Sequence, residues 1–361
     1  MRIVVKVGTN LLTQKDGSLN VQRIQSFAED IAKLKNAGHQ VVLVTSGAIG
    51  SGMGKLGWTA RPATLREKQA LAAIGQPLLM NVYQEYFSKL DITIAQVLLT
   101  RQDFDDRQAY LNARNTMLTL LELGAVPIIN ENDTVATEEI KIGENDTLSA
   151  LVAAKINADY VILFTDVEGL YKGVPGKSEL VSRVEEITPE IEAYATGVSS
   201  SGKGVGGMHT KLQAAKIATA AGVRMVIASG ARAGVIEKII NGEPIGTLFL
   251  PNQSLDARKC WIAFGTKCRG KIVVDEGAAR ALLNSGKSLL PSGIVSVEGK
   301  FEVGDPVSVF TTAKKEIGRG LTYYSAEEIE KIKGKKSSEI KKILGHADYE
   351  DVIHRDNLVI L

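Results

Sequence analysis

Two lysines occur at sequence positions where the ammonium group needs a negatively charged or polar partner. Lys6 lies in an apolar run at residues 3–7, and a buried lysine must have its charge satisfied, unless it stands at a sheet edge and reaches water. Lys211 follows the glycine-rich run 202–208 and precedes an alanine-rich helical pattern. Glycines before a helix expose N–H groups to anions, and a lysine in the first turn is unfavourable without one. The two lysines predict a polyphosphate site.

Two clusters combine carboxylates with amides. They are NENDT at 130–134, after a strand pattern, and GENDT at 143–147, before a helix expected over 148–157. Helix capping by Asp or Asn explains part of this composition. Two clusters so close together exceed the needs of capping, so we interpret them as sites for an ammonium group, a metal ion, or both.

Two further polar runs directly follow apolar strand patterns. TSGAIGSGMG at 45–54 offers hydroxyls and N–H groups to an anion. FTDVEGLY at 164–171 contains Thr165 and Asp166, although a plain turn also explains its Asp and Gly. Neither a P-loop nor a correctly placed dinucleotide motif is present in the sequence. Lysines, anion loops and carboxylates without these motifs are typical of phosphoryl transfer, in which catalysis is mostly positioning and charge neutralisation.

The elements that must position these residues alternate in type. Amphipathic helices separate the strand patterns; one helix places Val21, Ile24, Phe27, Ile31 and Leu34 on a single face. This rhythm predicts an α/β fold, an α/β/α sandwich around a parallel sheet with ligands at the carboxyl ends of the strands. The expected strands are 3–7, 40–45, 93–99, 126–130, 160–165 and 224–228.

A second, smaller domain is predicted by a change of pattern after residue 250. Short β-like pieces at 271–275, 293–298 and 305–310 surround a helix at 278–285, and a charged helical segment precedes a last strand at 358–361. The predicted organisation is therefore a catalytic domain at 1–250, a linker at 251–268 and a β-rich domain at 269–361.

Composition excludes several classes of protein. The 361 residues are 44% hydrophobic and 23% charged, with a net charge of +2, so disorder and a strongly basic nucleic-acid binder are not indicated. Two cysteines without a CxxC pattern favour reduced thiols over zinc or disulfides. The N-terminus has no apolar leader, and the longest uncharged helical stretch, 69–84, is too short to span a bilayer. We expect a soluble, cytoplasmic protein.

The order and spacing of these runs resemble the amino-acid kinase family, and within it the members that act on free glutamate. The part from about residue 269 is similar to a PUA domain. The resemblance implies the amino-acid kinase fold and ATP-dependent phosphorylation of the L-glutamate γ-carboxylate, the first step of proline biosynthesis, with Mg²⁺ carried by ATP. It is carried by KVGTN at 6–10, TSGAIGSG at 45–52, NENDTV at 130–135, GENDTLSA at 143–150, LFTDVEGLY at 163–171 and GGMHTKLQAA at 206–215.

The resemblance also implies individual roles. Catalysis falls to Lys6, Lys211 and Asp146, the last orienting the lysines or the metal. Glutamate is bound by Ser46, Asp133 and Asn145, with Asp133 suited to the α-ammonium. The residues implied in ATP binding are Lys6, Thr165, Asp166, Val205, Gly206, Gly207, Met208, His209, Thr210 and Lys211. His209, taken by itself, is interpreted as a loop residue. Val205 and Glu144 depart from the usual Thr and Asp of the family.

Partners and alternatives follow from the same resemblance. It implies a homo-oligomer (dimer or tetramer), feedback inhibition by proline and transient contact with glutamyl phosphate reductase. Related kinases act on N-acetylglutamate, aspartate, carbamate or UMP. Asp133 discriminates free glutamate from the acetylated substrate, because an acetylated α-nitrogen needs no carboxylate.

PUA domains elsewhere bind RNA. Here 15 Lys and Arg are interleaved with 14 Asp and Glu over 269–361, which favours a solvated surface and leaves RNA as the lesser alternative.

Overall fold

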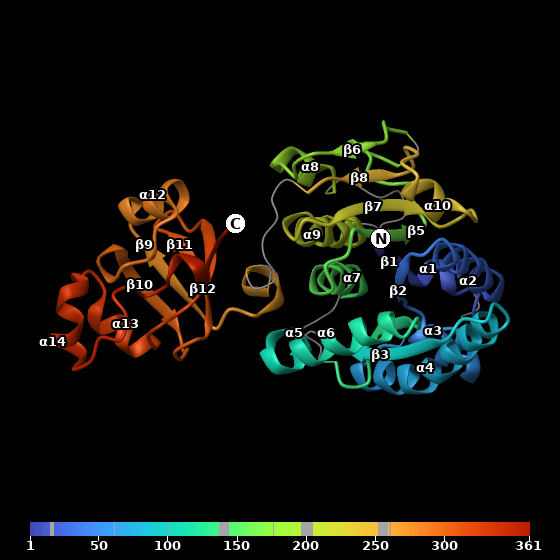
Figure 1. The fold of residues 1–361 in the computed structure, drawn as a ribbon, viewed down its shortest axis with the longest axis horizontal. Coiled ribbons are helices and arrows are strands. Elements are labelled where there is room, and N and C mark those ends of the chain that lie inside the picture. Colours follow the sequence, from blue (N-terminus) through green and yellow to red (C-terminus); the bar gives the residue numbers. More distant parts are fainter. Residues whose placement is uncertain are drawn as a thin grey trace. The chain divides into compact units, whose positions relative to one another are not determined.

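The computed structural model describes residues 1–14, 18–60, 62–100, 102–136, 144–175, 177–195, 205–251, 259 and 261–361. The chain divides into two compact units, Met1–Ser254 and Leu255–Leu361 (Figure 1). Part of the predicted linker lies outside the described residues. Within the described ranges, no helix combines the length and apolar character that crossing a bilayer requires.

An eight-stranded sheet forms the centre of the larger unit, with strand order β3-β4-β2-β1-β5-β7-β8-β6. The predicted parallel sheet is confirmed, except that β7 and β8 run antiparallel. The two shortest strands, β6 and β8, escaped prediction because two or three residues carry no periodicity. The strands are β1 (Arg2–Val7), β2 (Gln40–Val44), β3 (Ile94–Leu99), β4 (Val126–Glu131), β5 (Tyr160–Thr165), β6 (Arg183–Val184), β7 (Arg224–Ser229) and β8 (Thr247–Phe249).

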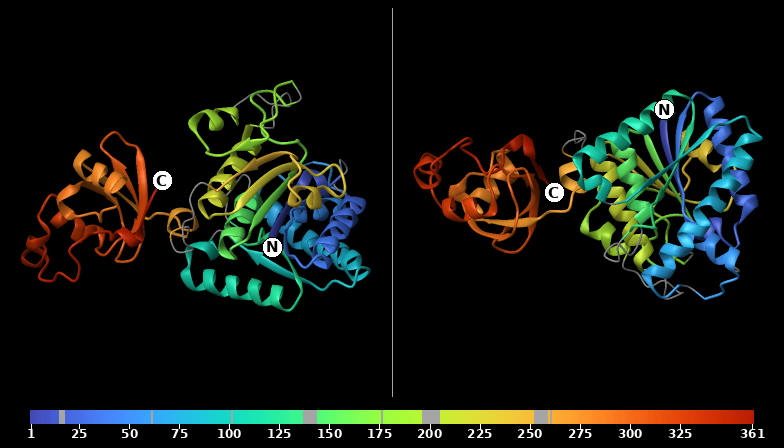
Figure 2. Two further views of the ribbon diagram at one scale, coloured as in Figure 1. Left: turned by 45° about the horizontal axis from the view of Figure 1, so that its top comes forward. Right: turned by 90° about the horizontal axis from the view of Figure 1, so that it is seen from below.

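Helices cover both faces of this sheet (Figure 2). On one face α2 contacts α4 and α10, and on the other α7 contacts β1, β5 and α9. The helices are α1 (Thr9–Leu12), α2 (Val21–Asn36), α3 (Ala48–Leu56), α4 (Leu65–Ser88), α5 (Gln102–Asp105), α6 (Arg107–Glu122), α7 (Glu144–Lys155), α8 (Pro189–Tyr194), α9 (Val205–Ala220) and α10 (Val235–Ile240).

Side chains alternate between the two faces of strand β1, so its odd-numbered apolar residues and its lysine lie on opposite sides of the sheet. Ile3, Val5 and Val7 join the core cluster on the side of α2 and α4. Because alternate side chains of a strand point to opposite faces, Lys6 is directed to the side of α7. The sequence alternation therefore decides which helices can supply the partner of Lys6.

Tight packing of α3 against α4 explains the glycines of the run 45–54. The prediction of a loop there is wrong beyond Gly47, because α3 begins at Ala48. A Cβ on Gly52 would stand 2.1 Å from the carbonyl oxygen of Leu71, and a Cβ on Gly75 would stand 1.8 Å from that of Ala48. These glycines thus allow two helix backbones to approach; they do not form an open anion loop.

Gly75→Ala should force α3 away from α4. We expect the free energy of unfolding to fall by about 1–3 kcal/mol, the range for inserting a methyl group into a packed interface. Urea denaturation of the variant, followed by circular dichroism, measures this change. Ile74→Ala, at an exposed position of the same helix, is the control. Equal stabilities of the two variants would contradict the packing argument.

The smaller unit contains a five-stranded sheet of order β10-β9-β11-β12-β13. Its predicted strands are confirmed to within one residue, except that β12 was not anticipated. Helix α12 begins two residues earlier than predicted, since Asp275 caps it by accepting from Ala278 N. The elements are β9 (Gly270–Val274), α12 (Glu276–Ser285), β10 (Ile294–Gly299), β11 (Pro306–Thr311), β12 (Glu316–Leu321), α13 (Ala326–Ile332), α14 (Ile340–Leu344) and β13 (Leu358–Ile360).

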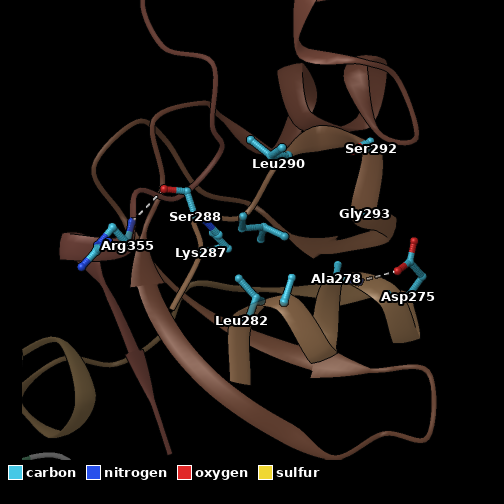
Figure 3. A pocket seen from close by; sticks show the side chains of 12 residues that line it. Asp275, Ala278, Leu282, Lys287, Ser288, Leu290, Ser292, Gly293 and Arg355 are labelled. Atoms are coloured by element: carbon cyan, nitrogen blue, oxygen red, sulfur yellow. Dashed lines mark hydrogen bonds between the residues drawn. The ribbon is translucent and has the colours of Figure 1, made fainter. Parts of the chain in front are cut away.

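A pocket of about 640 Å³ opens beside α12 in this smaller unit (Figure 3). Leu282 and Leu289 form apolar parts of its wall, and Lys287 and Arg355 also line it. No aromatic side chain is present among the described residues that line it. The pocket therefore lacks the rings on which single-stranded nucleic acid commonly stacks.

Lys155, the last residue of α7, is fully buried between aromatic rings. Its ammonium nitrogen lies 4.0 Å from the ring centre of Phe104 and 4.1 Å from that of Tyr110. No hydrogen-bond partner for this nitrogen occurs among the residues that the structure describes. Burial lowers the pKa of Lys155 to about 7, against the opposing attraction of Asp103.

Replacement of Lys155 by Met should change how stability depends on pH. Between pH 7 and the value of 10.5 usual for lysine, the unfolded chain binds more protons than the folded protein. The wild type should therefore gain stability relative to Lys155→Met as pH rises from 7 to 10, by up to about 1.4 kcal/mol per pH unit. Urea denaturation of both proteins across this range measures the gain; parallel curves would show that Lys155 titrates normally.

Candidate active site

A buried carboxylate between two lysines forms the centre of the candidate site. Asp146, in the first turn of α7, lies 2.6 Å from the ammonium of Lys6 and 3.0 Å from that of Lys211. The exposed fractions of the side chains of Lys6, Asp146 and Lys211 are 9%, 3% and 11%. The structure thus joins the three predicted catalytic residues, from β1, α7 and α9.

Two hydroxyl groups bond to Asp146, one at its carboxylate and one at its main-chain carbonyl. Thr210 donates to Oδ2 of Asp146 over 3.1 Å and lies one residue before Lys211. The hydroxyl of Ser149 donates to the Asp146 carbonyl over 2.6 Å. Lys211 also donates to the carbonyl of Gly207 over 3.2 Å. The triad is therefore fixed in orientation as well as in distance.

The electrostatics of the triad favour an anion. Burial would raise the pKa of Asp146, but the ammonium groups of Lys6 and Lys211 outweigh it and hold that pKa below its usual value. Burial lowers the pKa of Lys6, and the attraction of Asp146 only partly opposes this. With both lysines protonated, two positive charges share one negative charge, so the triad carries an excess positive charge suited to phosphate.

Helix α9 begins earlier than the sequence indicated. Its first residue is Val205, so His209, interpreted as a loop residue, lies in the helix with an exposed side chain. Lys211 falls in the second turn, and Asp146 compensates its charge. The argument that Lys211 needs an anion because it occupies the first turn is therefore wrong. Glycine has a poor helix propensity, so the sequence placed the start of this helix too late. Contacts between α7 and α9 override that propensity.

A chain of neutral polar groups runs from Ser46 into α4. Asn145 Nδ2 donates to Ser46 Oγ over 3.0 Å and to Asn130 Oδ1 over 3.2 Å. Asn130 Nδ2 in turn donates to Gln76 Oε1 over 2.8 Å. Within the described residues, the buried Oδ1 of Asn145 has no hydrogen-bond partner. Ser46 and Asn145 are thus brought together as predicted, whereas Asn130 and Gln76 were not assigned from the sequence.

Asp133 lies in the turn after β4 and is half-buried. Among the described residues, no hydrogen bond or ion pair holds its carboxylate. Burial raises the pKa of Asp133 to about 6. The structure does not link Asp133 by a hydrogen bond to Ser46 or Asn145, so its part in a common site stays a prediction.

The ends of β1 and β5 place a second acidic group near the lysines. Asp166 accepts from Asn10 Nδ2 and from Thr165 Oγ1, each over 3.0 Å. Burial would raise the pKa of Asp166, but these hydrogen bonds lower it and keep the group ionised. Its charge attracts the ammonium of Lys6. Asn10 belongs to the run KVGTN but was not assigned, because only the parallel pairing of β1 with β5 brings it to Asp166.

Some predicted residues lie beyond what the structure describes. The side chains of Glu144, Val205 and Gly206 are outside it, so the two departures from the family pattern are not tested. In the described part of the chain, no group of three or more His, Cys, Asp and Glu could hold a metal ion. Both carboxylate oxygens of Asp146 face lysines, which fits an orienting role better than metal ligation.

Comparison with known proteins finds matches to both units of the chain. The model of the amino acid kinase family matches residues 1–229, and that of the PUA domain matches residues 270–344. Glutamate 5-kinase of Thermoanaerobacter pseudethanolicus is 53% identical over 100% of this chain and 98% of its own length. That of Moorella thermoacetica is 53% identical over 100% and 96%. UMP kinase of Bacillus anthracis has 16% identity and a TM-score of 0.48, covering 70% of this chain and 97% of its own.

The match of the family model covers all three residues of the triad and the strands β1 to β7. The relatives extend the similarity through the smaller unit to the end of the chain. On these grounds the chain belongs to the amino acid kinase family, with a PUA domain after its kinase domain.

Proposed function

We propose that this protein transfers the γ-phosphate of ATP to the γ-carboxylate of L-glutamate, giving L-glutamyl 5-phosphate and ADP, the first step of proline biosynthesis. The observation that carries the proposal is the pair of buried lysines on Asp146. It is supported by relatives named glutamate 5-kinase that match the whole chain at 53% identity.

The reaction requires little covalent chemistry from the protein. A carboxylate oxygen of glutamate attacks the γ-phosphorus, and the bond from that phosphorus to the bridging oxygen of ADP breaks. The acceptor is already ionised at neutral pH, so no general base is needed. The main obstacle is repulsion between the acceptor anion and the phosphate charge, which positive groups relieve.

The lysine triad suits this task. Lys6 and Lys211 neutralise charge on the transferring phosphoryl group, and Asp146 sets the distance and direction of both ammonium groups. Mg²⁺ enters with ATP and neutralises its phosphates, while the protein supplies the fixed cations. Thr165, Asp166 and the start of α9, from Val205 to Lys211, bind the nucleotide.

The acceptor site lies on the other side of the triad in this proposal. Ser46 and Asn145, which hydrogen-bond to each other, hold the glutamate, and Asp133 accepts from its α-ammonium. The unpartnered Oδ1 of Asn145 supports this assignment, because a buried acceptor needs a donor. An N-acetylated substrate offers no ammonium to Asp133, so free glutamate is favoured.

Domain roles and partners complete the proposal. Residues 1–250 act as the catalytic domain, 251–268 as a linker and 269–361 as the PUA-like domain, which has a structural role. A cytoplasmic homo-oligomer, feedback inhibition by proline and hand-over of the labile acyl phosphate to glutamyl phosphate reductase are consistent with this chemistry. The absence of aromatic rings from the described lining of the pocket beside α12 gives no support to RNA binding.

Lys211→Ala should lower kcat by at least about 100-fold, because it removes a preorganised cation from the reacting phosphate. The assay supplies Mg-ATP and hydroxylamine with L-glutamate, N-acetyl-L-glutamate or L-aspartate, and measures the hydroxamate formed from the acyl phosphate. Lys216→Ala, on the same helix but paired with Glu192, is the control. Hydroxamate from N-acetyl-L-glutamate would refute the assignment of Asp133, hydroxamate from L-aspartate alone would refute glutamate as the substrate, and none from any acid would refute acyl-phosphate formation.

Asp133 should make glutamate binding depend on pH. With a pKa of about 6, its ionised fraction rises about tenfold from pH 5 to pH 7. Because only the carboxylate pairs with the α-ammonium, kcat/KM for glutamate should rise by about the same factor. Asp133→Asn should lower kcat/KM at pH 7 and flatten this profile. An unchanged profile in the variant would assign the titration to another group.

A further inference from the structure

Helix α4 carries three polar side chains on one stripe of its surface. Gln69, Gln76 and Tyr83 are spaced by seven residues, close to two turns of an α-helix, so they share a face. Leu79 and Phe87 on the same side are buried in the core. Polar groups on such a face are costly unless they are partnered, so their partners indicate their role.

Two of these side chains contact β4 and the turn that follows it. The Gln69 amide donates to the carbonyl of Ala136 over 3.1 Å, three residues beyond Asp133. Gln76 is buried and its Oε1 accepts from Asn130 over 2.8 Å. In the described residues Nε2 of Gln76 has no partner, so the bond to Asn130 orients the Gln76 amide. The same bond holds Nδ2 of Asn130, whose Oδ1 accepts from Asn145 and from the backbone N–H of Glu131.

The third side chain contacts the segment after β2. The hydroxyls of Tyr83 and Thr45 lie 2.7 Å apart. Thr45 donates its own proton to the carbonyl of Ser46, so Tyr83 is the donor to Thr45. Burial raises the pKa of Tyr83, and the hydroxyl therefore keeps its proton at neutral pH. The position of Ser46 depends on this contact.

The backbone of α4 also packs against the segment after β2, at Ala48. The carbonyl of Ala48, two residues after Ser46, lies so close to Gly75 that a Cβ on Gly75 would stand 1.8 Å from it. Gly75 directly precedes Gln76. One helix thus contacts every segment to which the acceptor site is assigned, apart from α7, which it reaches through Asn130 and Asn145.

We propose that Gln69, Gln76 and Tyr83 are positioning residues of the acceptor site, acting through Ala136, Asn130 and Thr45. The inference rests on the proposed function. Within the described part of the chain, none of the three bonds to the lysine triad. Their loss should therefore weaken binding of the acceptor and leave binding of ATP intact.

Gln76→Leu is the central test. It removes the acceptor for Asn130 and leaves a buried amide donor unpaired, so KM for the acceptor should rise about tenfold. KM for ATP should stay within about twofold, because within the described residues Gln76 makes no hydrogen bond to Lys6, Asp146 or Lys211. Gln84→Leu, at an exposed position of the same helix where the amide donates to Ser88, is the matched control. The hydroxamate assay with the full chain measures both constants.

Two further variants separate positioning from general damage. Adding Gln76→Leu to the Asn130→Ala variant should give no further rise in KM for the acceptor, because Asn130→Ala has already removed the hydrogen bond between the two residues. Tyr83→Phe deletes one oxygen and keeps the ring; it should raise acceptor KM about threefold even if Gln76→Leu does not fold. Independent, multiplying effects in the double variant would overturn the proposal. So would equal rises in both KM values, or a fall in kcat alone.

The design distinguishes this inference from the proposed function. The acceptor for all KM measurements is whichever of the three acids the wild type phosphorylates. Another acid in place of L-glutamate refutes the substrate, while a selective rise in its KM still supports the role of α4. Phosphorylation of L-glutamate with unchanged KM in Gln76→Leu and Tyr83→Phe overturns the inference alone. No phosphorylation of any acid overturns both.

Discussion

Two buried ammonium groups sharing one buried carboxylate set the constraint on which the catalytic unit depends. Lys6 and Lys211 come from distant parts of the sequence and lie 2.6 and 3.0 Å from Asp146. Burying the lysines without that carboxylate would be costly, and burying the carboxylate alone would be costly as well. The sheet and its covering helices must therefore close around all three together.

The two sides of the candidate site are built from different chemistry. The lysine triad, with which we propose that the phosphates interact, is charged, and Coulomb attraction in a buried setting fixes its distances. Around the proposed acceptor site, Ser46, Asn130 and Asn145 form a neutral network whose geometry depends on hydrogen-bond direction. Such a network holds its shape only if its last member is anchored, and α4 supplies that anchor through Gln76.

Glycines illustrate how one residue type serves different purposes. The run 45–54 looked like a phosphate loop, yet Gly52 lies in α3 and allows contact with Leu71 of α4. Gly207, near the start of α9, differs: among the described residues, no atom lies within 4 Å of a Cβ built on it. Sequence composition cannot separate these uses, because the difference lies in what the missing Cβ would meet.

The sequence by itself determined the alternation of strands and helices, the two-domain organisation and the runs that carry chemistry. Apolar periodicity predicted the six main strands, and the polar residues at their ends located Lys6, Asp146 and Lys211. Only the tertiary structure decided that Asp146 bridges both lysines, that α3 and α9 begin inside glycine-rich runs, and that Gln76 bonds to Asn130 and Asn10 to Asp166. Those outcomes depend on contacts between distant segments, and local propensity carries no information about which group will stand opposite another across a folded sheet.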